Sequence, residues 1–356
     1  MEQKLIFTNA VGNALDNLVD ALDAASVTII TDTNTLRLVL PLLQADSRTA
    51  ASARIITIKS DDINKNLDGL KHVWTGLAEG DVTRKSLIIN LGGGVVTDLG
   101  GFAAATFKRG IPYINIPTTL LGAVDASVGG KTAINFNGLK NQLGTFTEAL
   151  ASVISTVYLN TLPRQEILSG YAGMLKHGLL DDTDTFASLL KYNPIYPDFE
   201  SESLLPLLRK SVSVKSRIVE ADPLEKGPRK ALNLGHTAGH AIEAFAMKHG
   251  KPIPHGYAVA HGLVIELVLS HIRLGFPAET LRQLAAYILE NYGAFDIRCD
   301  DYDELISYMR ADKKNSTPDE INFTLLHAIG KPQTDCTAAP GQIGAAIDIY
   351  RDLTGL

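Results

Sequence analysis

The stretch "LIINLGGGVVTDLGGF", residues 87–102, decides the fold of the N-terminal half of the chain. It opens with an apolar run typical of a buried strand, passes through three glycines, Gly92 to Gly94, and leads into a helix that we expect to begin near Asp98. Glycines at such a turn let the backbone approach a phosphate group, which the N-terminus of the following helix attracts. The pattern GxGxxG is absent, because Thr97 stands at the position of its last glycine. A phosphate site and a tight structural turn therefore both remain open.

Similar strand patterns recur along the first half of the chain. They occupy residues 26–32, 53–60, 113–119 and 152–159, with helical patterns at 34–44 and 67–80. This alternation predicts an α/β fold with a Rossmann-like, largely parallel sheet. Helical periodicity then dominates, at residues 164–180, 203–221, 257–275 and 279–293, and only 320–330 indicates a strand or hairpin. We therefore predict an α/β domain at 1–161 and a mainly α-helical domain at 162–356.

The composition excludes several classes of protein. The chain has 356 residues, 45% of them hydrophobic and 20% charged, with a net charge of -6, which argues against general nucleic-acid binding. We find no apolar run of bilayer length and no signal peptide, which predicts a cytoplasmic protein without membrane association. Two cysteines, Cys299 and Cys336, are too few for a disulfide framework and lack the spacing of a zinc cluster.

A second segment that could bind phosphate begins within the strand pattern at 113–119. Residues 116–141, "IPTTLLGAVDASVGGKTAINFNGLKN", combine lysines, threonines and an aspartate with many small residues, in what we expect to be a loop region. A solvated loop needs few small residues beside its lysines, whereas a pocket for phosphorylated ligands does need them.

The segment "LNLGHTAGHAIEAF", residues 232–245, places His236 and His240 four residues apart. On a helix this spacing puts both imidazoles on one face, which suits two ligands of one metal ion, or a ligand beside a proton-transfer base. A hydrogen-bonded histidine pair in the core has the same spacing.

Taken together, these motifs resemble the dehydroquinate synthase family over nearly the whole chain. The matching segments are "GGGVVTDLGGFAAATFKRG", "IPTTLLGAVDASVGGKTAIN", "KN" at 140–141, "LPRQEILSGYAGMLKHGL", "RKALNLGHTAGHAIE", "HGYAVAHG" and "ADKK". The resemblance implies an NAD-binding α/β domain, a helical metal- and substrate-binding domain and a homodimer. It also implies the conversion of 3-deoxy-D-arabino-heptulosonate 7-phosphate to 3-dehydroquinate and phosphate, by oxidation, phosphate elimination, reduction and aldol closure, with NAD and Zn²⁺ or Co²⁺ as cofactors.

The resemblance also assigns the residues that bind the cofactor and the substrate. Those matching NAD contacts are Asp32, Asn34, Asp62, Lys65, Gly93, Gly94, Val95, Val96, Thr97, Asp98, Thr118, Thr119, Lys131, Lys140 and Thr161. The matching substrate phosphate contacts are Lys131, Asn141 and an Arg109 from the partner subunit. Lys215 and Arg229 match groups that face a carboxylate, and Asp125, Lys176, Asn233 and Lys313, or less well Lys314, complete the set. A solvated helix start for Asp62 and Lys65, and surface ion pairs for the cations, are the structural alternatives.

For the metal, the resemblance implies two histidine ligands, His236 and His255. His240 then orients the substrate and assists proton transfer. The family pattern G-x-A-E-x-x-K carries a third ligand at its glutamate, and this chain has Gly173 there. Because glycine has no side-chain donor, we expect weak metal binding and reduced activity. Tyr257 replaces a glutamate that is no ligand in the family, and we expect structural roles for His177, His249 and His261.

Other interpretations remain open at this stage. A related sugar phosphate cyclase would share the fold, but the two cations Lys215 and Arg229 favour a substrate with a carboxylate. A metal-dependent polyol dehydrogenase would have no use for the phosphate contacts. The third alternative, suggested by Gly173, is an NAD-binding protein without catalysis.

Overall fold

The computed structural model describes residues 3–195, 201–311, 315 and 321–356 of the chain. The chain divides into two compact units. The first comprises Met1–Pro163 with Glu200–Val212, and the second Arg164–Phe199 with Ser213–Leu356.

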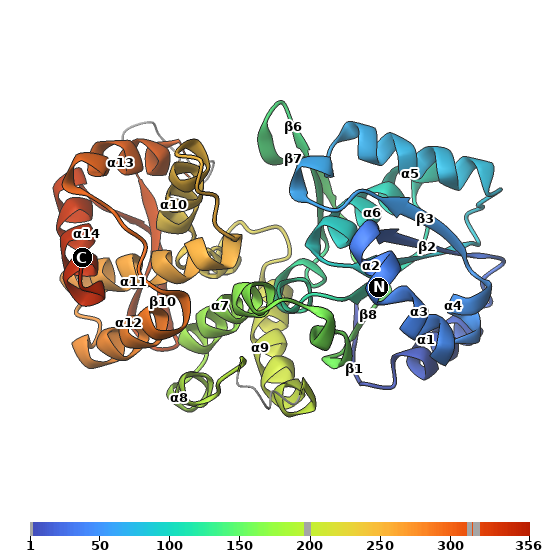
Figure 1. Ribbon diagram of the computed structural model, residues 1–356, viewed down its shortest axis with the longest axis horizontal. Helices are drawn as coiled ribbons and strands as arrows, with labels where there is room; N and C mark the ends of the chain where they lie inside the picture. The colour runs from blue at the N-terminus through green and yellow to red at the C-terminus, as the bar shows by residue number, and fades with distance from the viewer. Residues whose placement is uncertain (1–2, 196–200, 312–314, 316–320) are drawn as a thin grey trace. The chain divides into compact units, whose positions relative to one another are not determined.

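A six-stranded parallel sheet forms the centre of the first unit, as predicted (Figure 1). Its order is β1-β8-β5-β4-β2-β3, and every neighbouring pair is parallel. The strands are β1 (Lys4–Phe7), β2 (Val27–Asp32), β3 (Arg54–Ile58), β4 (Leu87–Gly92), β5 (Tyr113–Pro117) and β8 (Ala151–Ile154). Three of the strand patterns coincide with β2, β3 and β5, whereas the pattern at 152–159 was too long, because a 3₁₀ helix at Val157–Thr161 follows β8.

Helices cover both faces of this sheet, which explains why most of the buried residues on its strands are apolar. Successive residues point to opposite faces, so that Ile30 packs with α5 (Leu67–Glu79) and α6 (Gly94–Thr106). Its neighbour Ile29 packs with α1 (Val11–Leu22), α3 (Leu40–Asp46) and α4 (Arg48–Ser52) on the other face. A short helix α2 (Thr33–Leu38) follows β2 directly.

Two further sequence expectations in this unit were wrong. Helix α6 begins at Gly94 and not near Asp98, because the amides of Val96 and Thr97 already bond to the Gly93 carbonyl. The expected loop at 116–141 contains a π-helical turn, Gly122–Ala126, and an antiparallel hairpin of β6 (Lys131–Phe136) and β7 (Leu139–Phe146). The hairpin turns at Asn137–Gly138, where both residues have positive φ.

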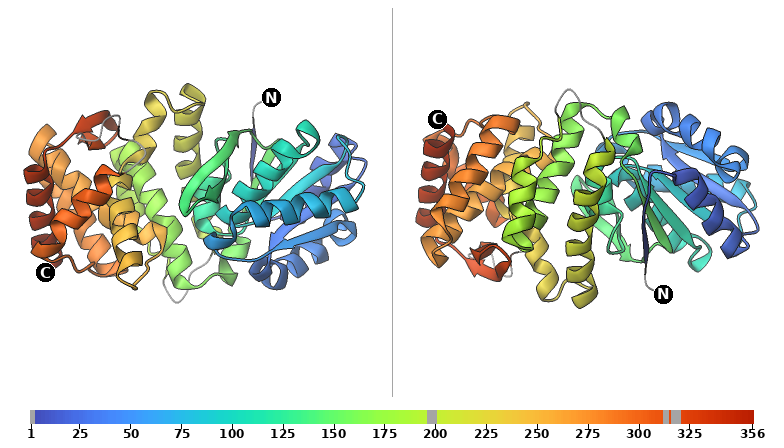
Figure 2. Two further views of the ribbon diagram at one scale, coloured as in Figure 1. Left: turned by 90° about the horizontal axis from the view of Figure 1, so that it is seen from above. Right: turned by 90° about the horizontal axis from the view of Figure 1, so that it is seen from below.

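The second unit is mainly helical, as predicted. Its helices are α7 (Arg164–Leu180), α8 (Thr183–Lys191), the last part of α9 (Ser201–Ala221), α10 (His236–Lys248), α11 (His255–Leu274), α12 (Ala278–Tyr292), α13 (Tyr302–Arg310) and α14 (Pro340–Thr354). The segment 320–330, predicted as a strand or hairpin, forms the single strand β9 (Asn322–Ala328), which pairs with β10 (Lys331–Thr337), a strand that was not predicted. Figure 2 shows the orange and red helices of this unit side by side.

Helix α11 is the central helix of the second unit and contacts α7, α10, α12 and α14. By length and composition alone it would suffice to cross a membrane, so the expectation that no such apolar run exists was wrong. Within the structure, 72% of that apolar window is buried, as in the core helix of a globular unit.

Candidate functional site

The glycine-rich turn joins the end of β4 to the start of α6. A Cβ atom on Gly92 would lie 2.4 Å from the Val96 side chain, and one on Gly93 would lie 2.9 Å from that of Thr119. Packing therefore requires these two glycines, which supports the structural alternative for the turn. A Cβ on Gly94 would meet only the Ala126 side chain, at 3.4 Å, so packing alone does not demand this glycine. Gly93 and Gly94 are only partly buried, and a helix N-terminus that solvent can reach fits a pyrophosphate.

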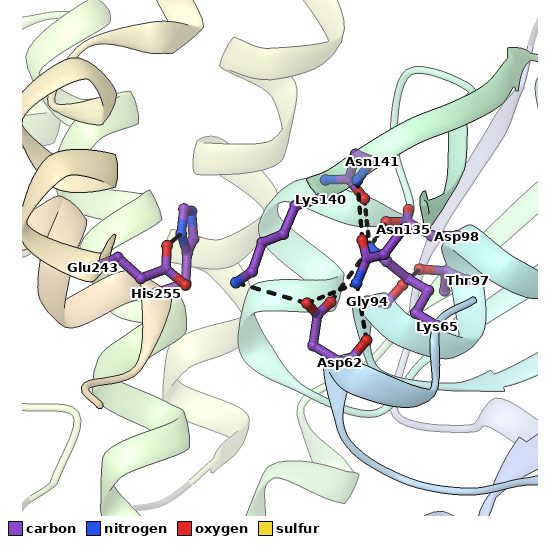
Figure 3. Close-up of polar contacts among 10 residues, drawn as sticks. All are labelled: Asp62, Lys65, Gly94, Thr97, Asp98, Asn135, Lys140, Asn141, Glu243 and His255. Atoms are coloured by element: carbon purple, nitrogen blue, oxygen red, sulfur yellow. Dashed lines mark hydrogen bonds and ion pairs between the residues drawn. The ribbon is translucent and has the colours of Figure 1, made fainter. Parts of the chain in front are cut away.

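Lys65 is a buried lysine at the centre of the polar cluster beside this turn (Figure 3). Its Nζ lies 2.9 Å from Oδ2 of Asp98, 2.6 Å from Oδ1 of Asn141 and 3.6 Å from Oδ1 of Asp62. Only 5% of the residue is exposed, so the solvated helix start considered for Lys65 is wrong. Lys65 thus contacts both Asp98, which the resemblance assigned to NAD binding, and Asn141, which it assigned to binding of the substrate phosphate.

Asn135, on β6, is a member of this cluster that the sequence analysis missed. Its Nδ2 donates to the backbone oxygen and to Oδ2 of Asp62, both at 3.0 Å, and its Oδ1 accepts from the amide of Asn141 at 3.0 Å. Lys140 completes the cluster, with Nζ 3.7 Å from Oδ2 of Asp62. The dipeptide Asn137–Gly138 is a strong hairpin signal. A hairpin that turns at this dipeptide brings Asn135 close to Lys140 and Asn141, so the sequence could have indicated this contact.

Asp32 and Asn34 lie at the end of β2 and the start of α2. Oδ1 of Asp32 accepts from the amides of Asn34 and Thr35, at 2.9 and 3.1 Å, and Oδ2 accepts from the Thr35 hydroxyl at 2.7 Å. Ser60 donates to the same carboxylate at 3.1 Å. Asp32 therefore caps α2 in this structure, and its contact with a cofactor stays a prediction.

The remaining predicted cofactor residues are spread over the same unit. Val95, Val96 and Thr97 form the first turn of α6. Thr118 follows β5, and its amide donates to the Gly92 carbonyl at 3.0 Å. Thr161 ends a 3₁₀ helix, where its hydroxyl donates to the Tyr158 carbonyl at 2.7 Å.

Arg109 lies away from the polar cluster, in a basic hollow of about 670 Å³ lined by Thr83, Arg84, Lys85 and Lys108. Its φ of 68° places it in the left-handed region. Among the described residues, the lining of this hollow includes neither Lys131 nor Asn141, which were predicted to share a phosphate with the partner subunit's Arg109. Lys131 begins β6 and is exposed, and Asp125 belongs to the π-helical turn.

Three histidines of the second unit lie together at the start of α10 and α11. The ring centroids are 5.5 Å apart for His236 and His240, 5.6 Å for His236 and His255, and 5.7 Å for His240 and His255. Nδ1 of His236 lies 3.1 Å from the Leu234 carbonyl, and Nδ1 of His255 lies 3.0 Å from Oε2 of Glu243 (Figure 3). A carbonyl or carboxylate on one ring nitrogen fixes the tautomer that leaves Nε2 to bind a metal. The core-pair alternative for His236 and His240 also stays open, since neither ring is fully exposed.

Position 173 lies on the face of α7 that packs against the start of α11. The amide of Gly256 donates to the Ser169 hydroxyl at 3.1 Å, and a Cβ on Gly256 would lie 1.9 Å from the Ser169 carbonyl oxygen. Gly173 follows Ser169 by one helical turn and Lys176 follows by two, so all three residues share a face. The family's third ligand would therefore project from a helix that touches the residue next to His255.

His236 and His255 are suitable ligands for a metal ion, but two protein ligands do not complete a catalytic metal site. Gly173 supplies no donor atom, and among the described residues no group of three His, Cys, Asp or Glu side chains is arranged to hold a metal ion. A catalytic zinc ordinarily has three protein ligands.

Buried cations and an acidic loop occupy other parts of the second unit. Lys176, Lys215 and Arg229 are each less than 5% exposed. Asn233 donates to Oε1 of Glu225 at 3.1 Å, which brings an acidic residue that the sequence analysis missed beside a predicted substrate contact. Lys313 and Lys314 lie outside the described residues.

The loop before Asn233 is shaped by Asp222. Burial works toward a higher pKa for its carboxyl, but the amides of Gly227, Lys226 and Arg229 donate to it and hold the pKa below its ordinary value. Arg229 also donates through Nη1 to the Pro223 carbonyl at 2.5 Å.

The other predicted structural histidines have contacts of their own. His261 is 2% exposed, its Nδ1 lies 3.1 Å from the Tyr350 hydroxyl, and burial lowers its pKa to about 4. His249 lies 3.2 Å from a carboxylate oxygen of Glu304, and His177 is fully buried. Tyr257 packs its ring against that of Tyr292, with centroids 5.0 Å apart.

Comparison with known proteins places these features in a family. Residues 55–169 match the model of the 3-dehydroquinate synthase N-terminal domain, and residues 170–315 match that of the C-terminal domain. A 3-dehydroquinate synthase of Parabacteroides distasonis is 45% identical over 355 residues, covering 100% of this chain and 99% of the relative.

Two solved structures resemble the fold. One is 2-epi-5-epi-valiolone synthase from Streptomyces hygroscopicus with NAD⁺ and Zn²⁺ bound, at a TM-score of 0.84 and 23% identity, covering 99% of this chain and 97% of that one. The other is 2-deoxy-scyllo-inosose synthase with carbaglucose-6-phosphate, NAD⁺ and Co²⁺, at a TM-score of 0.83 and 21% identity, covering 98% of this chain and 96% of that one.

The chain belongs to the 3-dehydroquinate synthase family, which confirms the predicted resemblance. This membership makes it an enzyme of the phosphate-eliminating cyclase type.

Proposed function

We propose that this chain converts 3-deoxy-D-arabino-heptulosonate 7-phosphate to 3-dehydroquinate and phosphate, as a homodimer in the cytoplasm without membrane or nucleic-acid partners. The observation that carries the proposal is 45% identity over the whole chain to a 3-dehydroquinate synthase. The buried cations Lys215 and Arg229 support a substrate that has a carboxylate, because a buried cation is stabilised by an anion.

We assign NAD binding to the first unit. The cofactor, when bound, accepts a hydride from the substrate alcohol and later returns it. The amide end of α6, which follows Gly93 and Gly94, receives the pyrophosphate. Lys65 holds Asp98 and Asn141 in fixed positions beside that turn, so its role is to organise the site as much as to contact the cofactor.

Phosphate binding is assigned to the β6–β7 hairpin. Lys131 and Asn141 lie on this hairpin and Arg109 of the partner subunit completes the set, since Arg109 of the same chain lies in a separate basic hollow. The hairpin also exposes Phe136, Leu139, Leu143 and Phe146, each by 38–59%, and an apolar surface on a two-stranded ribbon supports contact with a second copy.

In the second unit, Lys176, Asn233 and one lysine of 313–314 bind substrate hydroxyl or carboxylate groups, and Asp125 of the first unit does the same. His240 orients the substrate and moves a proton, while His236 and His255 are the metal ligands. Gly173 leaves this pair without its third partner, so we propose that the chain binds zinc weakly and reaches full activity only at high zinc concentration.

Phosphate release tests the function directly. With the heptulosonate phosphate, NAD and zinc, a cyclase of this kind releases phosphate without net NADH. A polyol dehydrogenase would accumulate NADH instead. A non-catalytic NAD-binding protein, the alternative that Gly173 favours, would bind NAD by calorimetry and produce neither signal.

A further inference from the structure

Helix α10 begins with a histidine and has no capping side chain of its own. Its N-cap residue is Gly235, with φ of 78°, and a Cβ there would lie 2.7 Å from the Leu263 side chain. Neither the backbone conformation nor the available space admits a serine or aspartate at this position. The first amides of α10, which have no partner within the helix, must therefore bond elsewhere.

Glu266 of α11 supplies this missing cap. Its Oε2 accepts from the amide of Gly235 at 2.6 Å, and its Oε1 accepts from the amide of Ala238 at 3.0 Å. These are the N-cap and N3 amides, the same two that a capping box satisfies from within a helix. Glu266 is the only acidic residue in the sequence of α11 and is fully buried.

Close packing of the two helices makes this contact possible. A Cβ on Gly262 would lie 2.2 Å from the Gly235 carbonyl oxygen and 2.6 Å from the Gly239 amide nitrogen. Glu266 follows Gly262 by one turn, so its carboxylate arrives at the end of α10 from the same face.

The two capped amides flank His236, the first residue of the helix. The contact also has a counterpart in the opposite direction, because Glu243 of α10 holds the ring of His255 at the start of α11. Each helix thus begins with a histidine and receives a carboxylate from the other helix.

We infer that Glu266 is a positioning residue, which fixes the first turn of α10 and through it the His236 imidazole. This inference rests on the proposed role of His236 as a metal ligand. The favourable interaction of a carboxylate with a helix N-terminus supports it, since that end carries a partial positive charge.

Hydrogen exchange tests the backbone part of the inference without any metal. In the unmodified chain, the amides of Gly235 and Ala238 should exchange as slowly as amides inside α10. In Glu266→Gln, which keeps the shape but replaces one acceptor oxygen by an NH₂ group, exchange at residues 235–238 should rise at least tenfold. Rapid exchange of these amides in the unmodified chain, or no change in a folded variant, would overturn the inference.

Titration with Co²⁺, followed by its visible absorption, tests the consequence for His236. We expect Glu266→Gln to bind Co²⁺ roughly 10- to 100-fold more weakly and to shift the spectrum, as loss of an outer partner of a ligand does. The matched control is Tyr350→Phe, which removes a buried hydroxyl contact to His261 in the same unit and should leave Co²⁺ binding unchanged.

A third variant, His236→Ala, separates the two proposals. If His236→Ala does not weaken Co²⁺ binding, the proposed metal site is wrong, whereas the exchange experiment still decides whether Glu266 holds the turn. If His236→Ala abolishes binding while Glu266→Gln binds Co²⁺ with an unchanged spectrum and affinity, Glu266 is a purely structural residue and the inference fails.

Discussion

Replacing Lys65 by methionine should destabilise the first unit as well as alter its ligand binding. The substitution keeps an unbranched chain of similar length and removes the ammonium group. Nζ of Lys65 lies within 3 Å of both Asp98 and Asn141, and 6% of the side chain is exposed. Loss of one member of a buried ion pair costs about 3–5 kcal/mol. Because 18% of the Asp98 side chain is exposed to screening water, we expect the lower end, about 3 kcal/mol.

A loss of about 3 kcal/mol lowers the ratio of folded to unfolded protein roughly 150-fold. Urea unfolding followed by tryptophan fluorescence measures it, because Trp74 is the only tryptophan and packs against the core of the first unit. The matched control is Lys59→Met, since Lys59 is exposed and the change should stay within about 0.5 kcal/mol. A Lys65→Met effect below about 1 kcal/mol would show that Lys65 does not stabilise the unit, and that its contacts matter only when ligand is bound.

Three further changes test other parts of the molecule. Gly94→Val should abolish NAD binding measured by calorimetry while the protein stays folded, and unchanged affinity would remove the cofactor from this turn. Chains with Arg109→Ala and chains with Lys131→Ala should regain part of their activity when mixed, whereas verified mixed dimers without activity would place Arg109 in the site of its own subunit. The depressed pKa of His261, about 4 against an ordinary 6.5, means that the unfolded chain binds more protons between these values. Stability should therefore fall by about 3 kcal/mol as the pH drops from about 6.5 to 4, and an unchanged slope in His261→Phe would contradict this origin.

The sheet and most long helices could be predicted because their signals are local. Buried parallel strands form predominantly apolar runs, and α7 coincides with the predicted segment 164–180. The start of α6 was misplaced for a physical reason. The helix begins after Gly93, and glycine has no side chain that could signal a helix start in the sequence.

The contacts within the site could not be predicted in the same way. Lys65 and Asn141 are 76 positions apart, and nothing in the pattern around either residue indicates that one binds the other. The cap that Glu266 gives to α10 depends on how closely two helices pack, which sequence spacing does not reveal. The family resemblance indicated which residues belong to the site. It did not indicate which of these residues contact and position one another.

The dependence of phosphate release on zinc, compared between the unmodified chain and Gly173→Glu, tests the proposed function most directly. We expect both proteins to release phosphate from the heptulosonate phosphate, with Gly173→Glu half-saturated at a zinc concentration at least about tenfold lower, because the new carboxylate restores a third ligand. Adding His236→Ala should erase that gain. Absence of phosphate release from the unmodified chain at any zinc concentration would contradict the proposed activity. Equal zinc requirements in the two proteins would contradict the proposed metal site.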